Sequence, residues 1–345
     1  ADIMALTSLD TAPESYVSCT DVSPTSRHRH PAKHATIADA ASAVWLAAAY
    51  VALHWPDIGD FTRTNELAFA FAAIGGGLLI ATGAATLLRS LRERLTALAP
   101  WLLALAGFFL TWEAFAAKLG WLPQPFFPPP QALLEVYTDD WEKLGTSVLH
   151  SLRLLGIGYV IGALAGFSVG VAIGWYKAAS YWIHPVLRFI GPLPAVAWLP
   201  IAFFAFPSSW SASIFLIALA TGFPVAILTW SGIAAVPSSY YDVARTLGAR
   251  ERFLILKVAV PAAMPSVFVG LFMGMGGSFA VLVVAEMMGV KAGLGWYLPW
   301  AQGWAAYANM YAALLAMSVM CSGLVSLLFR LRDYLLGWQK GLLRW

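Results

Sequence analysis

Long apolar segments separated by short polar stretches dominate the chain. Each approaches or exceeds the roughly 20 residues that a helix rising about 1.5 Å per residue needs to cross about 30 Å of hydrocarbon. No ten-residue alternation indicates a β-barrel, so the spanning elements must be helices. The pattern predicts an all-α polytopic membrane protein with eight spans, at residues 38–55, 67–88, 97–118, 149–174, 183–206, 211–235, 263–289 and 307–330.

The predicted fifth span is the least regular, because four prolines interrupt it: Pro185, Pro192, Pro194 and Pro200. Each proline removes a backbone donor and kinks or breaks a helix. Carbonyl groups freed at membrane depth are tolerated only against protein or a wet cavity. We therefore expect this segment to line a transport pathway, with Pro192, Pro194 and Trp198 as candidate pathway residues. The alternative is a structural helix that is merely kinked.

The predicted fourth span carries a glycine at every fourth position, at residues 158, 162, 166, 170 and 174. Such a ridge without side chains lets the backbone of a neighbouring helix approach closely. Tight packing within one subunit is the simpler interpretation and the one the sequence favours. A surface that slides against a neighbour during transport is the alternative.

The composition excludes several classes of protein. Apolar residues make up 60% of the chain and charged residues only 11%, whereas a soluble domain is about a quarter charged. A cytosolic enzyme, a disordered chain and a nucleic-acid binder are therefore excluded. Cys19 and Cys321 lie far apart, so they predict neither a disulfide framework nor a cysteine metal site. We expect no catalytic residue, metal or cofactor site in this chain.

The basic residues predict the orientation, because Lys and Arg accumulate on the cytoplasmic side. With the N-terminus inside, fifteen of the 21 Lys and Arg fall inside and four outside. This asymmetry favours an even number of spans with both termini cytoplasmic. Residues 1–37 are poor in apolar side chains, which predicts a flexible cytoplasmic tail. Residues 38–96 would hold two N-terminal transmembrane helices and residues 97–345 the remaining core.

The inner loop at residues 236–262 is unusually regular for a connector. Pro237 and Ser238 predict a helix start. The negative charge of Asp242, in the first turns, would interact favourably with the helix dipole. Ala244 and Gly248 lie four residues apart and so share a face that carries no bulk. Such a face suits docking in a groove of another protein. Further candidates for the contact with this partner are Tyr241, Arg245 and Leu247, then Arg250 at the start of a second helix and Pro261 at its end.

This loop resembles the cytoplasmic signature of ATP-binding-cassette (ABC) importer permeases, in which E-A-A, three residues, G, nine residues and I-x-L-P follow in order. The corresponding residues are Asp242-Val243-Ala244, Gly248 and Val258-Ala259-Val260-Pro261, with both spacings intact. Two further stretches are similar to the nitrate, sulfonate and taurine branch of these permeases. They are Leu193-Pro194-Ala195-Val196-Ala197-Trp198-Leu199-Pro200, and Ala285-Glu286-Met287-Met288 followed by Gly293-Leu294-Gly295. The spans at residues 38–88 depart from the usual pattern.

The resemblance implies a type I importer core of six helices preceded by two additional ones. It implies a multi-pass subunit of the bacterial inner membrane that pairs with a second copy of itself, two ABC ATPase subunits and a periplasmic substrate-binding protein. The chain contains no G-x-x-x-x-G-K-[ST] phosphate loop. ATP and Mg would therefore be bound by the partner ATPases, and this chain would not itself be an enzyme. The solute would be small and anionic, of the sulfonate, taurine or nitrate type.

Charged residues in or near the spans are the remaining pathway candidates. Glu286 lies near the outer end of the seventh predicted span, where a carboxylate should face protein or water. A structural pairing or helix-capping role is at least as well supported as contact with solute. Glu113, Arg153 and Arg188 are candidate partners. Either arginine could instead attract an anion by charge-assisted hydrogen bonds, or extend to the lipid headgroups.

Two other classes of function are alternatives to the importer. An ion-coupled secondary transporter would have several paired intramembrane carboxylates and often internal repeats, and the sequence has few of the former and none of the latter. A membrane enzyme or sensor would need a catalytic cluster or an attached domain. Neither His150 nor His184 lies in such a motif.

Overall fold

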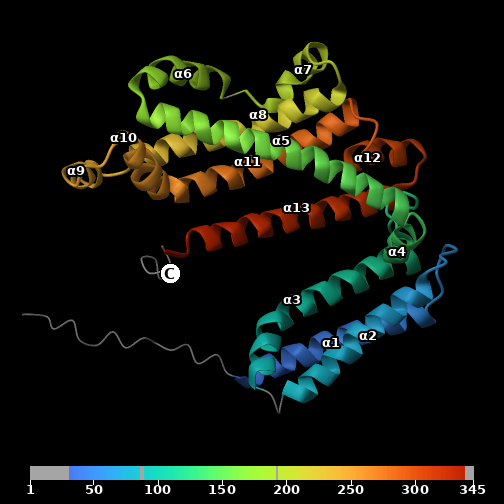
Figure 1. Cartoon of the computed structure of the whole chain (residues 1–345). Helices are drawn as coiled ribbons and strands as arrows, with labels where there is room; N and C mark the ends of the chain where they lie inside the picture. The colour runs from blue at the N-terminus through green and yellow to red at the C-terminus, as the bar shows by residue number, and fades with distance from the viewer. Residues whose placement is uncertain (1–30, 86–88, 192, 339–345) are drawn as a thin grey trace, which may run out of the picture.

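The computed structural model describes residues 31–85, 89–191 and 193–338, and every regular element within these ranges is helical. The helices are α1 (Pro31–His54), α2 (Thr64–Ala85), α3 (Arg89–Glu113), which continues as η1 (Ala114–Lys118), α4 (Pro130–Asp139), α5 (Trp141–Trp175), α6 (Lys177–Ile190), η2 (Ala195–Trp198), α7 (Leu199–Ala205), α8 (Ser209–Ala234), α9 (Ser238–Thr246), α10 (Glu251–Phe253), η3 (Leu254–Ala259), α11 (Val260–Met288), α12 (Leu294–Gly303) and α13 (Tyr307–Leu335). Figure 1 shows their arrangement. The prediction of an all-α membrane protein is confirmed.

Seven helical segments within the described ranges are long and apolar enough to cross a membrane. They are Ile37–His54, Thr64–Ala85, Ala97–Lys118, Trp141–Trp175, Ser209–Ala234, Glu251–Met288 and Tyr307–Leu335. Each overlaps one of the predicted spans. Helix α1 begins at Pro31, so the helical structure starts earlier than the predicted end of the tail at residue 37. The rest of the predicted tail, residues 1–30, lies outside the described residues.

The predicted span at residues 183–206 is not one continuous helix. Helix α6 and the pair η2 and α7 meet at an angle of 91°, so this segment forms a broken span or a re-entrant loop. Pro194 lies between the two arms in an extended conformation, which a proline imposes readily and an α-helix cannot continue. By contrast, Pro185 lies inside α6 without ending it. Pro192 lies outside the described residues.

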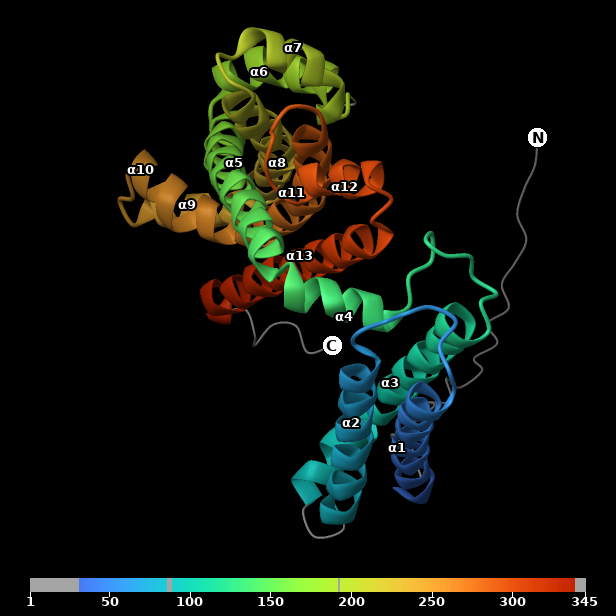
Figure 2. The ribbon, with the colours of Figure 1, turned by 90° about the vertical axis from the view of Figure 1, so that its right-hand side faces the viewer.

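The first three helices form a unit of their own. Trp45 from α1, Phe71 from α2 and Phe109 from α3 meet with ring centroids 5.3 to 5.8 Å apart. Figure 2 shows this unit beside the remaining helices, with α4 at the junction. Helix α3 packs against α1 and α2, so the packing does not follow the predicted boundary at residue 96. These contacts depend mainly on aromatic side chains, with one close approach at Gly75 of α2, where a Cβ atom would lie 2.9 Å from the Leu46 side chain of α1.

Helices α5, α8 and α11 form the centre of the larger unit. The glycines of α5 face α8 so closely that a Cβ atom on Gly162 would collide with the backbone of Ala218, and one on Gly166 with that of Gly222. A Cβ atom on Gly170 would lie 2.6 Å from the carbonyl oxygen of Ala226. The glycine ridge therefore serves tight packing within one subunit, as the simpler interpretation predicted.

The predicted inner and outer ends of the helices fall on opposite sides of the molecule. In Figure 1, α9, α10, the end of α13 and the start of α1 point to the left, whereas α4 and α12 lie at the right. This arrangement agrees with the orientation predicted from the basic residues. It places the predicted docking loop and the outer polar contacts at the two ends of the same helices.

Candidate functional site

Helix α9 is the predicted docking helix, and its boundaries are those the sequence indicated. It begins at Ser238 after an extended Pro237, and the chain leaves it at Gly248, whose φ of +80° favours glycine. Residues 251–259 then continue without a break into α11, with Arg250 as the exposed cap residue of α10 and Pro261 in the first turn of α11. The loop is therefore two helices joined by a tight turn.

Tyr241 anchors α9 to the core. Its ring meets that of Trp175 edge-on, with centroids 5.6 Å apart, and it packs against a buried cluster that includes Ile233, Ala259 and Ala263. Burial of the phenol raises the pKa of Tyr241 above its usual range. Because these neighbours belong to α5, α8, η3 and α11, a force applied to α9 reaches the central helices directly.

The exposed side of α9 carries a ridge of large apolar side chains. Tyr240, Val243 and Leu247 are 57%, 62% and 83% exposed, and their spacing of three and four residues places them on one face. Ala244 beside this ridge is half-buried, whereas nothing lies within 4 Å of a Cβ atom built on Gly248. The exposed face of α9 is thus open but not smooth, and it includes Tyr240, which the sequence prediction did not name.

The charged residues of α9 contribute little to its stability. Asp242 pairs with Arg245 at 3.5 Å, and both side chains are more than half exposed, where such a pair is worth about 1 kcal/mol or less. No acidic residue lies in the first turn of α9, so the expected interaction of Asp242 with the helix dipole is wrong. The two side chains are available to a partner.

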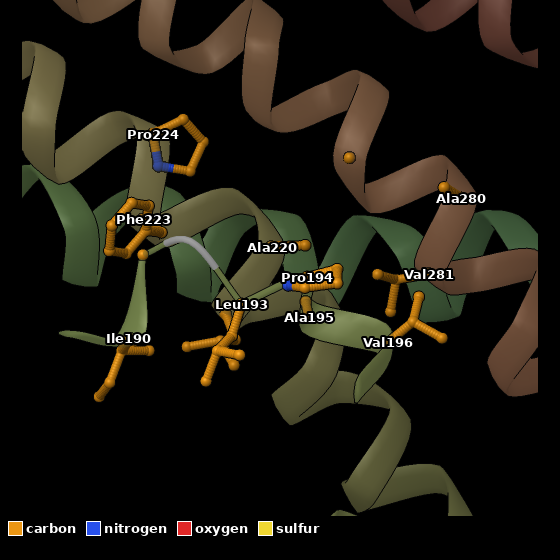
Figure 3. A pocket seen from close by; sticks show the side chains of 13 residues that line it. Ile190, Leu193, Pro194, Ala195, Val196, Ala220, Phe223, Pro224, Ala280 and Val281 are labelled. Carbon is orange, nitrogen blue, oxygen red and sulfur yellow. The ribbon is translucent and has the colours of Figure 1, made fainter. Parts of the chain in front are cut away.

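A cavity of about 260 Å³ lies where the chain breaks between α6 and η2 (Figure 3). Pro194 and Ala195 contribute to it from the break, Phe223 and Pro224 from α8, and Val281 from α11. None of its lining side chains is charged or able to form hydrogen bonds. The complete lining comprises Ile190, Gly191, Leu193, Pro194, Ala195, Val196, Leu219, Ala220, Phe223, Pro224, Gly277, Ala280 and Val281. Of the predicted pathway residues that the structure describes, Pro194 alone lines this cavity.

The other predicted pathway residues lie elsewhere. Trp198 packs against the central apolar cluster, where its indole nitrogen is buried without a hydrogen-bond partner in the described part of the chain. Arg153 and Arg188 are exposed. Arg188 borders a separate open hollow on α6, together with His184. The structure therefore does not bring the two arginines together with the cavity.

Glu286 is buried at the end of α11 and accepts hydrogen bonds from two donors, the Ser151 hydroxyl and the Gly295 backbone nitrogen. Ser151 Oγ lies 2.8 and 2.9 Å from its two carboxylate oxygens, and the backbone nitrogen of Gly295 lies 2.7 Å from Oε2. The nitrogen of Leu294 donates to Ser151 Oγ at 2.8 Å. The Glu286 carboxylate and the Ser151 hydroxyl thus satisfy two free donors at the start of α12. A Cβ atom on Gly295 would collide with Glu286, which explains the glycine there.

These contacts support the helix-capping role for Glu286. Within the described ranges, neither arginine pairs with Glu286, and Glu113 lies in a separate cluster with Lys118 and Gln131. The sequence indicated this role only through the position of a carboxylate near the end of a span, where it must face protein or water. It gave no sign of Ser151, which lies 135 positions earlier.

The chain is similar in sequence to several permease proteins of transport systems. The bicarbonate transport system permease protein CmpB of Synechococcus elongatus is 29% identical over 268 residues, covering 74% of this chain and 94% of that protein. The nitrate import permease protein NrtB of the same organism is 30% identical, covering 60% of this chain and 76% of that protein. A probable ABC transporter permease protein of Brucella abortus is also 30% identical, covering 57% and 79%.

Structural similarity is weaker. A chain from an inward-facing MetNI methionine ABC transporter aligns with a TM-score of 0.49 and 16% identity, covering 57% of this chain and 98% of that one. The family model described as binding-protein-dependent transport system inner membrane component matches residues 158–338, which include α9 and the cavity. The chain therefore belongs to the binding-protein-dependent transport system inner membrane component family.

Proposed function

We propose that the chain is the transmembrane permease subunit of an ATP-driven importer. It would act as a homodimer with two ABC ATPase subunits, which bind ATP and Mg, and with a periplasmic binding protein that delivers the solute. The observation that carries this proposal is the exposed apolar ridge of α9, held at the predicted cytoplasmic end of the core by Tyr241. A solvated connector needs no such ridge.

The contacts of α9 support a mechanism in which this helix transmits the ATP-driven motion of the ATPases to the permease. ATP-driven closure of the ATPases would draw the two α9 helices of the dimer together. Because Tyr241 is packed against Trp175, Ile233 and Ala259, the central helices would follow as a unit. The glycine contacts between α5 and α8 leave no free volume to absorb the motion. The core would therefore alternate between two arrangements that nucleotide biases.

The solute is proposed to be a small anion, because similar permeases are named for bicarbonate and nitrate. The cavity of this subunit offers an anion no charged or hydrogen-bonding side chain. Selection of the solute is therefore assigned to the binding protein, and the permease would supply a passage with few strong binding groups.

Substitution of Leu247 by Asp tests the docking surface. The charge would be buried against the ATPase without a partner, so we expect the permease to retain its membrane insertion and lose at least about tenfold in affinity for the co-expressed ATPase. Tyr334→Asp is a matched control, since Tyr334 is 84% exposed at the end of α13. Co-purification of both variants with the ATPase at wild-type yield would refute the proposal.

A transport assay separates the importer from an ion-coupled transporter. In vesicles that hold a constant ATP concentration, dissipating the proton and sodium gradients should leave uptake unchanged. Loss of uptake under these conditions would assign the energy source to an ion gradient instead.

A further inference from the structure

A cluster of polar side chains is buried where the N-terminal unit meets α4. Glu113 and Lys118 come from the end of α3 and from η1, Asp57 from the loop after α1, and Gln131 from the first turn of α4. Glu113 and Gln131 are completely buried, and Lys118 is 5% exposed. None of these residues takes part in the proposed transport mechanism. Buried polar groups at this density must satisfy one another to avoid a large cost.

The ammonium group of Lys118 has three donors, and three oxygen atoms already surround it. It donates to the carbonyl oxygens of Ala52 at 2.9 Å and Trp55 at 2.6 Å, at the end of α1. It forms an ion pair with Asp57 Oδ1 at 2.7 Å. The nearest oxygen of Glu113 is farther away, at 3.7 Å. Lys118 therefore lies closer to Asp57 than to Glu113, and its single positive charge can neutralise only one of the two carboxylates.

Glu113 and Gln131 are left with one hydrogen bond and two unsatisfied oxygens. Gln131 Nε2 donates to Glu113 Oε1 at 3.3 Å. Glu113 Oε2 and Gln131 Oε1 are both buried without a hydrogen-bond partner among the described residues. Both atoms are acceptors when Glu113 is ionised. An ionised Glu113 would therefore be a buried charge with one long hydrogen bond and an ammonium group 3.7 Å away that it shares with Asp57. This is a costly arrangement.

We propose that Glu113 and Gln131 form a proton-binding site, in which Glu113 holds a proton on Oε2 and donates it to Gln131 Oε1. One proton then satisfies both unpartnered oxygens. The acid and the amide form a closed pair with two hydrogen bonds, and the cluster as a whole becomes neutral. A metal cation would fit less well, since it would lie beside the ammonium group of Lys118.

The pair fixes the position of α4 between the two parts of the molecule. On one side, Gln131 binds Glu113 of the N-terminal unit, and the Trp112 indole donates to the carbonyl oxygen of Pro128 at 3.1 Å. On the other side, the Tyr137 hydroxyl donates to the carbonyl oxygen of Ala312 in α13 at 2.7 Å. The N-terminal unit of α1, α2 and α3 is thereby linked to the core through α4, on the side where the binding protein would dock.

A second contact across the same junction is weaker because it is exposed. Arg63 lies 2.9 Å from Asp139 Oδ1, and this guanidinium lowers the pKa of Asp139 below its usual range. Half of the Asp139 side chain remains in contact with solvent, where an ion pair contributes little. The buried pair of Glu113 and Gln131 is therefore the contact that specifies how the junction is formed.

The proposal is tested with Glu113→Gln in the full-length chain. A second amide can form the same two hydrogen bonds with Gln131, so we expect a Tm within about 2 °C of wild type. Glu113→Leu removes both bonds and should lower the Tm by about 4 °C or more. If Glu113 were ionised instead, Glu113→Gln would break a buried charge interaction and lower the Tm as much as Glu113→Leu. That result would overturn the proposal.

Infrared spectroscopy provides a readout that a purely structural role would not change. The difference spectrum of wild type minus Glu113→Gln should contain the carbonyl band of a protonated carboxyl group, whereas Glu142→Gln, which removes an exposed acid, should not. In Gln131→Leu the band should shift, because the hydrogen bonds to the amide are lost. A spectrum that shows loss of an ionised carboxylate in Glu113→Gln would refute the protonated pair even if the Tm values agreed.

Discussion

The α5–α8 pair and the N-terminal unit both pack helices closely, but with opposite kinds of residue. In the α5–α8 pair, Gly162, Gly166 and Gly170 have no side chains, and the two backbones are therefore in direct contact. In the N-terminal unit, large rings fill the space, with Trp45 and Phe71 at 5.3 Å. Lipid offers no hydrophobic driving force between helices, so both pairs depend on close contact. The difference predicts a core that tolerates no added atoms and a unit that tolerates no removed ones.

The largest expected effect comes from adding a side chain to the glycine ridge. Gly166→Leu forces α5 away from Gly222 of α8, and because backbone atoms cannot yield as side chains do, we expect a destabilisation above about 4 kcal/mol. Gly156→Leu is the matched control on the same helix, since a Cβ atom there meets nothing within 4 Å. Thermal unfolding of the purified chains measures both. Equal loss in the two variants would mean that the ridge is not the contact that matters.

Removal of a ring from the N-terminal unit should have a smaller and more local effect. Trp45 is 2% exposed at the centre of the three helices, and Trp45→Ala should cost about 3 kcal/mol through lost packing contacts. Hydrogen exchange should rise in α1, α2 and α3 while α5 and α8 remain protected. A uniform rise across the chain would show that the two parts unfold together and would contradict the distinction drawn between them.

Deletion of the hydroxyl of Ser151 should have the smallest effect of the three. Ser151→Ala leaves the buried Glu286 carboxylate with the Gly295 nitrogen as its remaining partner and frees the nitrogen of Leu294. We expect a cost of about 1–3 kcal/mol, with faster amide exchange at the start of α12. Ser168→Ala, on an exposed face of α5, should leave α12 unchanged. Unchanged amide exchange at the start of α12 in Ser151→Ala would contradict the capping role.

Local sequence signals were sufficient for seven of the eight predicted spans and for α9. Apolar length fixes a membrane helix almost without reference to its neighbours, and Pro237 and Gly248 mark the two ends of α9 through their own backbone preferences. The resemblance to importer permeases depended on the loop that contains this segment and on two further short stretches, at residues 193–200 and 285–295. Its docking role, and the roles of Arg245, Leu247 and Arg250, stay predictions until a partner is tested.

Features that depend on distant partners could not be predicted. The caps on α12 join Ser151 to Glu286 across 135 positions, and Gln131 meets Glu113 across 18. The prolines indicated an irregular fifth span but did not specify a bend of 91°. Likewise, the boundary at residue 96 was placed by counting spans. The sequence did not show that α3 packs against α1 and α2. Tertiary packing decides each of these features.

Site-specific crosslinking of α9 tests the central claim most directly. In the intact complex, with Cys19 and Cys321 replaced by Ser, Val243→Cys and Tyr334→Cys would each be treated with a short bifunctional thiol reagent. The account predicts a crosslink from residue 243 to the ATPase subunit, stronger when ATP closes the ATPases, and none from residue 334. A cysteine at residue 243 that stays freely modifiable and uncrosslinked in the functional complex would contradict the assignment of α9 as the surface through which ATP drives transport.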